Sequence, residues 1–477
     1  MQERRNLRFT ALAGAIAIAI ALTGCGGGGS GNPHASDTTT GGKPSLPECP
    51  LAALRSAAKP VEITYWHAMT RANEDELKKL TKDFNARQPD VHVTLSASAS
   101  YTDNTTRFKA GLSTGALPDL MQGEDSSLQT LIDSQAVLPA ASCLKADGAD
   151  TSDLIPRVVA YYSVNNILYP MPFNDSNPIL YYNKAAFRKA GLDPNKPPVT
   201  FEQVQADSRK IVKSGAAQFG IALKTDSWPI EHWLAKSGNT IVNNDNGRRA
   251  RATKVTFDDA TGISVFRWID DMVKSKLALS TGTSDIDHYL AVGNGQAAMT
   301  IDTSAALGTI SQLFASGQYK NVELGVGAMP GPRSPNGSVL VGGAANYIVN
   351  KSTPAQQAAA YEFAKFLAAP KSQSEWAAAT GYVPVSKSAA TMSPLAERYA
   401  SQPAYKVAYD QLLAGPVNPA TSGPVIGAYG SAREGLRGAI VDALSRMLDG
   451  DLTPERAVAD AAEQANAAIK DYNSRIG

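Results

Sequence analysis

Aromatic side chains lie beside turn-forming residues at several expected strand ends of this sequence. The set consists of Tyr65, Trp66, His67, Tyr101, Trp228, Trp233 and Tyr382. Flat rings of this kind stack on the C–H faces of sugar-like rings, while neighbouring hydroxyls and carboxylates fix the oxygens of the ligand. Any one of these aromatic residues is more typical of a hydrophobic core than of a binding site. The set as a whole, at loop positions, predicts a site for a hydroxyl-rich small molecule.

Motifs for catalysis and cofactor binding give little support to an enzyme. The serine-hydrolase pattern Gly-x-Ser-x-Gly and the zinc pattern His-Glu-x-x-His do not occur in the sequence, and the five histidines are scattered. Residues 56–59 match Ser-x-x-Lys without its companion motifs, and the glycine-rich residues 325–331 have the wrong spacing for a dinucleotide loop. We therefore predict no catalytic residue, no metal and no cofactor. A glycosidase needs only two carboxylates, and 44 acidic residues leave a secreted glycan hydrolase open as the alternative.

Composition narrows the classes of protein further. The chain has 477 residues, of which 43% are apolar and 19% charged, so it can form packed cores and is long enough for about three domains. A formal net charge of +1 argues against a nucleic-acid-binding surface spread over the whole protein. The only apolar run long enough to suggest a membrane segment lies at the N-terminus, which excludes a multi-span transporter.

The elements expected to position these residues alternate between strands and helices. Residues 61–66 and 91–95 alternate apolar and polar side chains as strands do, and residues 73–86 repeat apolar side chains at helical spacing. This βαβ unit predicts a parallel sheet with a right-handed crossover. The pattern continues with an expected helix at 105–112, a strand at 119–121 and a helix at 126–132.

Helix start signals dominate the rest of the chain. Capping-box patterns at 200–203 and 353–356 open helices to about residues 212 and 367, and further helices are expected at 432–448 and after Thr453. The mixed pattern predicts an α/β fold with two lobes and a cleft between them.

The N-terminus has the features of an export signal. Arg4, Arg5 and Arg8 precede an apolar run at 9–22, and Cys25 follows Leu-Thr-Gly. This ending resembles the lipobox of bacterial lipoproteins, in which the signal is cleaved before the cysteine and the thiol carries lipid. We therefore predict a signal peptide at 1–24, lipidation at Cys25, a flexible tether at 25–58, and an exported protein anchored on the outer face of the cytoplasmic membrane. A plain signal peptide with an incidental cysteine is the alternative.

The other two cysteines, Cys49 and Cys143, form an even pair in an oxidising compartment. We predict a disulfide between them that joins the segment before the first strand to the first lobe. Two separate buried thiols are the alternative.

A longer block of residues resembles a known family. Residues 172–184 contain Asn-x-Ser-x-Pro-x-Leu-Tyr-Tyr-Asn-Lys, which looks like the extracellular solute-binding proteins of ABC importers. Within that sugar-type family the sequence is most similar to the glycerol-3-phosphate-binding branch. Four shorter segments agree, at 63–67, 295–299, 341–344 and 380–384.

The resemblance implies a hinged, two-lobed α/β receptor of the periplasmic-binding-protein type. Its expected parts are 59–174 (first lobe), 175–294 (second lobe), 295–345 (return to the first lobe) and 346–477 (second lobe, mostly helical).

The resemblance also implies a set of ligand-binding residues. They are Tyr101, Glu124, Ser176, Trp228, Gly342, Tyr382 and either Thr303 or Ser304. Glu124 can accept hydrogen bonds from two ligand hydroxyls, and Ser176 and the Gly342 backbone N–H can donate to ligand oxygens.

One position departs from the branch. Where the branch has an arginine that holds phosphate, this sequence has Val425, and Arg433 would match a different, structural arginine. A buried phosphate monoester without such a partner lacks a strong charge-assisted contact. The departure favours a neutral glycoside, a polyol or a phosphodiester, unless His67, Arg107 or Lys224 compensates.

These observations predict a monomeric substrate-binding lipoprotein. It would capture a carbohydrate or glycerol-phosphate-type solute and deliver it to the subunits of an ABC permease, with no nucleic-acid partner. A structural or adhesion lipoprotein without a small ligand is a further alternative.

Overall fold

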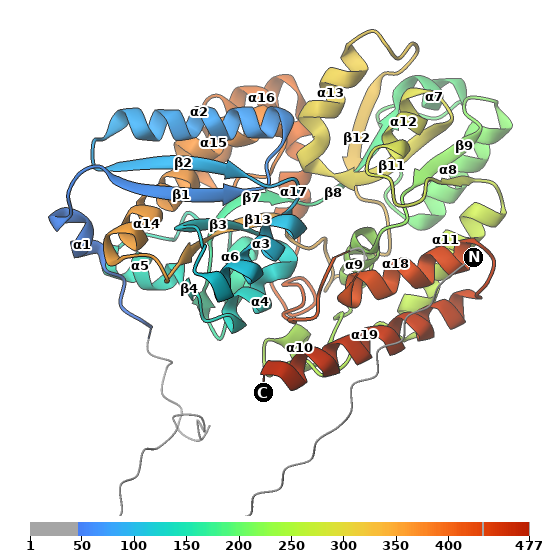
Figure 1. Cartoon of the computed structure of the whole chain (residues 1–477). Coiled ribbons are helices and arrows are strands. Elements are labelled where there is room, and N and C mark those ends of the chain that lie inside the picture. Colours follow the sequence, from blue (N-terminus) through green and yellow to red (C-terminus); the bar gives the residue numbers. More distant parts are fainter. Residues whose placement is uncertain (1–45, 432–433, 477) are drawn as a thin grey trace, which may run out of the picture. The chain divides into compact units, whose positions relative to one another are not determined.

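A computed structural model describes residues 46–431 and 434–476 (Figure 1). They fold around two separate β-sheets, as an α/β protein with two lobes. The predicted signal peptide, the predicted lipidation site Cys25, and Arg433 lie outside the described residues. No helix among those described is both long enough and apolar enough to cross a membrane.

The first sheet contains six strands in the order β2-β1-β3-β13-β4, with β7 also paired to β13. Their bounds are β1 (Val61–His67), β2 (Val91–Ala97), β3 (Leu120–Glu124), β4 (Val137–Leu138), β7 (Met171–Ser176) and β13 (Gly342–Val349). β1 runs parallel to β2 and β3, whereas β13 is antiparallel to β3, β4 and β7. The βαβ unit expected from the sequence is therefore present, with α2 (Arg71–Arg87) as its helix.

The further helices of the first lobe are α1 (Leu51–Ser56), α3 (Tyr101–Thr114), η1 (Asp125–Ser127), α4 (Leu128–Asp133), α5 (Ala140–Asp147), α6 (Pro156–Tyr162), α14 (Pro354–Ala368), α15 (Pro370–Thr380), η3 (Ser388–Thr391) and α16 (Leu395–Ser401). Three of them, α3, α4 and α14, lie near positions expected from the sequence, and the others were not predicted. Thr353 and Gln356 form the complete capping box that opens α14. A two-stranded ribbon, β5 (Ser163–Val164) and β6 (Ile167–Leu168), follows α6.

The second sheet has the order β10-β9-β11-β8-β12. Its strands are β8 (Pro178–Asn183), β9 (Phe219–Leu223), β10 (Ala278–Ser280), β11 (Ala297–Thr303) and β12 (Leu324–Ala328). The remaining helices are α7 (Lys184–Lys189), α8 (Phe201–Lys213), α9 (Ser227–Lys236), α10 (Asn243–Gly247), α11 (Ala260–Lys274), α12 (Asp287–Gly293), η2 (Ser304–Ala306), α13 (Leu307–Ala315), η4 (Pro403–Lys406), α17 (Val407–Leu413), α18 (Gly435–Leu448) and α19 (Pro454–Ile476).

The sheet order corrects the expected lobe boundaries after residue 294. β11 and β12, which we assigned to the first lobe, pair with β8 in the second sheet, and only β13 returns to the first. α14 packs on β1 and β7, and α15 packs on α2, so this part of the expected second lobe also belongs to the first. The sequence pattern gives the type of each element and not its sheet, because strand partners are distant in sequence.

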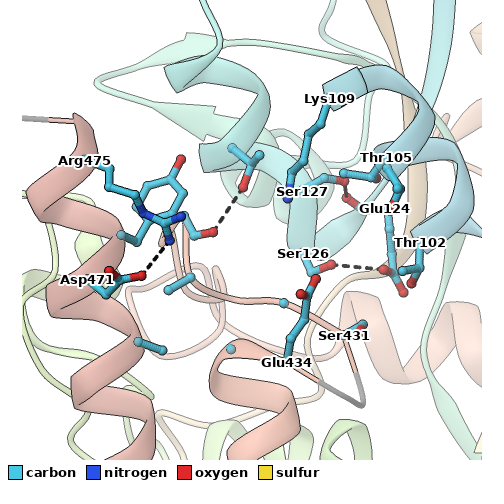
Figure 2. A pocket seen from close by; sticks show the side chains of 18 of the residues that line it. Thr102, Thr105, Lys109, Glu124, Ser126, Ser127, Ser431, Glu434, Asp471 and Arg475 are labelled. Atoms are coloured by element: carbon cyan, nitrogen blue, oxygen red, sulfur yellow. Dashed lines mark hydrogen bonds and ion pairs between the residues drawn. The ribbon is translucent and has the colours of Figure 1, made fainter. Parts of the chain in front are cut away.

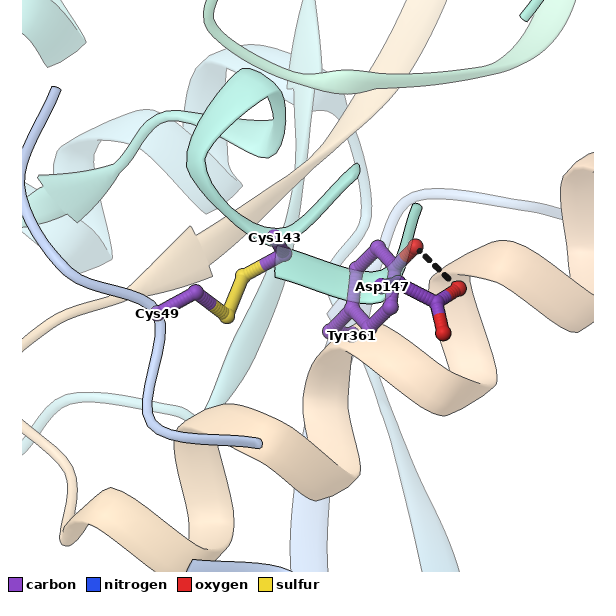
Figure 3. Close-up of a disulfide and its surroundings, with 4 residues drawn as sticks. All are labelled: Cys49, Cys143, Asp147 and Tyr361. Carbon is purple, nitrogen blue, oxygen red and sulfur yellow. Dashed lines mark hydrogen bonds between the residues drawn. A yellow bond between two sulfur atoms is a disulfide. The ribbon is translucent and has the colours of Figure 1, made fainter. Parts of the chain in front are cut away.

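The predicted disulfide between Cys49 and Cys143 is present, with a Cα–Cα distance of 4.9 Å (Figure 3). It joins the segment before α1 to α5, and α1 packs on α5 and α14. At the C-terminal end of α5, one turn after Cys143, Asp147 accepts a 2.9 Å hydrogen bond from Tyr361 of α14. The last part of the expected tether, from residue 46 to 58, is therefore folded against the first lobe.

Candidate ligand-binding site

The chain passes from the first sheet to the second between β7 and β8, and the strand ends of the first sheet meet there. β7 ends at Ser176, one residue before β8 begins, and every residue of both strands is buried. β13 pairs with β7 on one side and with β3 on the other, so Gly342 lies opposite Ser176 and Ala344 lies opposite Glu124. Glu124, Ser176 and Gly342 therefore lie at the same end of three neighbouring strands.

Tyr101 and Tyr382 meet next to this point. Tyr101 is the first residue of α3, and Tyr382 follows the left-handed C-cap of α15 at Gly381. The two phenol oxygens are 3.3 Å apart. Asn174 donates a 2.9 Å hydrogen bond to the Tyr101 hydroxyl and accepts one of 2.8 Å from Gln122. Two buried amides that the sequence analysis missed thus fix the tyrosine pair.

Burial controls the protonation of these phenols. It raises the pKa of Tyr101 well above the usual value, and it also raises the pKa of Tyr382. Both hydroxyls therefore stay protonated at neutral pH and can donate to a ligand oxygen as well as accept from a ligand hydroxyl.

Trp228 reaches the same strands from the second lobe. Asp226 is the N-cap of α9, and its side chain accepts a 3.1 Å hydrogen bond from the Trp228 backbone N–H. The indole lies against Gly342 so closely that a Cβ on this glycine would be 2.7 Å from the ring. The absence of a side chain at Gly342 therefore makes room for the tryptophan.

Ser304, rather than Thr303, has a hydroxyl that is available at this site. The Ser304 backbone N–H donates to the carbonyl of Asn177 at 3.0 Å, next to Ser176. Its hydroxyl is buried and makes no hydrogen bond with any described residue. The Thr303 hydroxyl instead accepts from the backbone N–H of Ala305.

Glu124 lies beside an arginine that the sequence analysis did not identify. Arg437 of α18 approaches the Glu124 carboxylate at 3.5 Å and that of Asp125 at 3.2 Å. It also forms two hydrogen bonds with Glu231 of α9, of 2.9 and 3.0 Å. One buried guanidinium is thus shared by carboxylates of both lobes. The signal in the sequence that could have indicated this residue is an arginine in the mostly apolar first half of α18.

Burial and crowding shift the protonation of this cluster. Burial raises the pKa of Asp125 to about 7; Arg437 opposes the shift, and Glu124 and Glu231 add to it. The pKa of Arg437 rises well above its usual value because the three surrounding acids outweigh the effect of its burial.

A cavity of about 470 Å³ begins at Glu124 (Figure 2). We call it the outer groove. Its walls come from α3, η1 and α4 of the first lobe, and from residues 427–428, 430–431 and 434–435 and α19 of the second. Of the residues that we predicted to bind ligand, only Glu124 lines it. The others surround the crossover, where their side chains pack on one another.

The cations that we considered as substitutes for the branch arginine are engaged elsewhere. Val425 is buried, and its backbone N–H donates to Asn246. Arg107 stacks on the ring of Trp66 with a centroid distance of 3.5 Å. Lys224 pairs with Asp226 and Asp285 at 2.8 Å each.

Several aromatic residues of the expected set belong to the core instead. Trp233 is buried against Phe201 and donates to the carbonyl of Pro330. Tyr65 donates to Asn346, and His67 is almost completely buried. These residues of the set are therefore core residues, as is typical of single aromatic side chains, because positions beside turns in the sequence can still point into the core.

Comparisons with known proteins identify the family and similar folds. Residues 79–407 match the family described as bacterial extracellular solute-binding protein. The sn-glycerol-3-phosphate-binding periplasmic protein UgpB of Pectobacterium atrosepticum is 29% identical over 434 residues, which are 89% of this chain and 95% of the relative.

Two solved structures share the fold. UgpB from Mycobacterium tuberculosis in complex with glycerophosphocholine has a TM-score of 0.71 and 21% identity, covering 86% of this chain and 99% of the other. The GacH receptor of Streptomyces glaucescens, known without ligand and with acarbose, has a TM-score of 0.70 and 22% identity, covering 86% and 98%.

Proposed function

Because this chain belongs to the family of bacterial extracellular solute-binding proteins, we propose that it captures a carbohydrate or glycerol-phosphate-type solute and delivers it to the permease of an ABC importer. The protein would release the solute chemically unaltered. The family supports this receptor function over the glycan hydrolase that we kept as the alternative.

The observation that carries the proposal is the meeting of both lobes at the crossover. Tyr101, Tyr382 and Gly342 come from the first lobe, whereas Trp228 and Ser304 come from the second. A ligand held between such groups binds the closed arrangement better than the open one, which is the condition for closure on binding.

Calorimetry against glycosides, polyols, glycerol 3-phosphate and its diesters tests the proposal. We expect saturable binding of at least one member. Tyr382→Phe should weaken that binding about 3- to 10-fold through loss of one hydrogen bond. The matched substitution Tyr399→Phe, in α16, should not. Turnover of the bound compound, or no binding across the panel, would contradict a receptor function.

We also propose that Cys25 carries lipid and anchors a monomer to the outer face of the cytoplasmic membrane. The Leu-Thr-Gly-Cys sequence after an apolar run supports this proposal. Fractionation of producing cells should find the protein with membranes and the Cys25→Ser variant free in the exported fraction. Equal membrane association of the two would rule the anchor out.

A further inference from the structure

A carboxylate of the first lobe is held by two side chains of the second, next to the outer groove. Asp133 ends α4, and only 7% of its side chain is exposed. The guanidinium of Arg251 donates one hydrogen bond to each of the two carboxylate oxygens, both of 2.9 Å. The Tyr472 hydroxyl of α19 donates another of 3.0 Å, and Gln129 within α4 donates one of 2.7 Å. We call Asp133, Arg251 and Tyr472 the clasp.

The backbone that carries Arg251 is fixed to the second lobe. The Asn244 side chain donates a 2.9 Å hydrogen bond to the Arg251 carbonyl. Asn473 of α19 donates one of 2.9 Å to the next carbonyl, that of Ala252. Asn244 itself has a left-handed φ of 58°, a conformation that asparagine adopts more readily than most residues. Because its backbone is already ordered, Arg251 loses little conformational freedom when it binds the carboxylate of the first lobe.

The clasp differs from the Arg437 cluster in its access to water. The Arg251 side chain is 42% exposed, whereas that of Arg437 is 8% exposed. If the lobes separate, the Arg251 guanidinium therefore returns to water at a small cost in free energy. In the closed arrangement it makes a bidentate, charge-assisted contact with Asp133. A contact of this kind can form and break as the lobes close and open.

We propose, building on the receptor function above, that the clasp sets the fraction of the protein that is closed. Both partners of each bond are protein groups, so the clasp can form whether or not a solute is bound. It keeps part of the ligand-free protein closed and lowers the cost of closure for every solute alike. Asp133 and Arg251 are not among the residues that line the outer groove, so they act on affinity through the conformational equilibrium.

Distances between the lobes of the ligand-free chain test the proposal. Spin labels at Ser113→Cys on α3 and Lys470→Cys on α19, which are exposed positions on opposite lobes, report opening. The chain also carries Cys25→Ser, so that the label does not react there. Pulsed electron–electron resonance should give a short and a long distance. Asp133→Asn and Arg251→Gln should each lower the ratio of closed to open protein at least about 5-fold.

An ion pair within one lobe provides the matched control. Glu455 pairs with Arg267 inside the second lobe, and its side chain is 49% exposed. Glu455→Gln should therefore leave the distances unchanged. The double variant Asp133→Asn/Arg251→Gln should shift the ratio little further than Asp133→Asn alone, because both substitutions remove the same contact. Melting curves of all variants control for misfolding.

Calorimetry with the panel of solutes separates this proposal from the receptor function. Asp133→Asn should weaken each compound that binds by the factor by which the closed fraction falls. A different factor would show that Asp133 acts on the solute directly, which would overturn the clasp. A single long distance in the wild type, or unchanged distances in both variants, would also overturn it and leave the receptor function intact. If no compound binds, the receptor function fails, while the label distances still decide whether the clasp exists.

Discussion

Buried polar residues form the segment in which the chain passes from β7 of the first sheet to β8 of the second. Asn174, Asp175, Ser176 and Asn177 are consecutive and almost completely buried. Asn174 fixes Tyr101, and Asn177 donates to the Ala408 carbonyl at 3.0 Å. Buried polar groups of this kind stabilise a structure only when they are hydrogen-bonded. The hydrogen bonds of Asn174 and Asn177 therefore fix the backbone at the place where the two lobes and the predicted ligand contacts meet.

Replacement of Trp228 by alanine should weaken ligand binding by at least about 10-fold, because the site loses its stacking surface from the second lobe. Calorimetry with whichever ligand the wild-type chain binds measures the effect. Trp228→Phe retains a ring and should keep most of the affinity. Unchanged affinity of the alanine variant would show that the indole only fills space beside Gly342.

The stability of the fold should fall between about pH 4 and pH 7 because of Asp125. Burial raises the pKa of this carboxyl to about 7, so in this window the folded chain holds a proton that the unfolded chain has lost. The free energy of unfolding therefore decreases as the pH rises through the window, and this loss is complete above it.

Urea unfolding at several pH values between about 4 and 7 measures this effect. The free energy of unfolding should decrease less with rising pH for Asp125→Asn than for wild type. Asp258→Asn, at an exposed position, is the matched control and should follow the wild type. A parallel pH dependence of all three chains would show that Asp125 is ionised throughout.

Secondary-structure elements divide the chain between the lobes in an order that short-range patterns do not reveal. β7 and β8 are separated by one residue and belong to different sheets, whereas β3 and β13 are neighbours across more than two hundred residues. α14 and α15 pack in the first lobe, and α18 and α19 pack on each other in the second. The disulfide acts at this scale too, because it holds the segment before β1 against α5.

Removal of the disulfide should cost about 2–5 kcal/mol of unfolding free energy, because the bond closes a loop across 94 positions and restricts the unfolded chain. Comparison of Cys49→Ser/Cys143→Ser with wild type by urea unfolding measures this loss. Reducing agent should lower the stability of wild type and leave the double variant unchanged. A wild-type chain that is insensitive to complete reduction would contradict the prediction.

At the scale of the whole molecule, Arg437 connects the lobes. Its helix α18 belongs to the second lobe with Glu231, whereas Glu124 ends β3 and Asp125 begins η1 of the first lobe. Tyr429 adds a 2.7 Å hydrogen bond to Glu231 and lies under the guanidinium. The cluster therefore stabilises the arrangement in which α9 and α18 of the second lobe contact the end of β3 in the first.

Replacement of Arg437 by methionine should destabilise the fold by about 3–5 kcal/mol, since it leaves buried carboxylates without their partner. Arg446→Met is a suitable control, because the Arg446 side chain forms ion pairs and is 41% exposed. Exposed ion pairs contribute less than about 1 kcal/mol to the free energy of unfolding. Urea unfolding at neutral pH compares the two. Similar losses would show that the acids of the cluster neutralise themselves by taking up protons.

The sequence by itself determined the α/β class, the first βαβ unit, the helix starts at Thr200 and Thr353, and the cysteine pair. It could do so because capping, side-chain alternation and cysteine pairing in an exported chain leave local or compositional signals. The family resemblance named residues that the fold does gather around the crossover. Only the tertiary structure decided which sheet each strand joins, that Trp233 and Tyr65 point into the core, and that Arg437 lies beside Glu124. Those features depend on contacts between residues far apart in the chain, and the spacing of residues along a sequence does not record them.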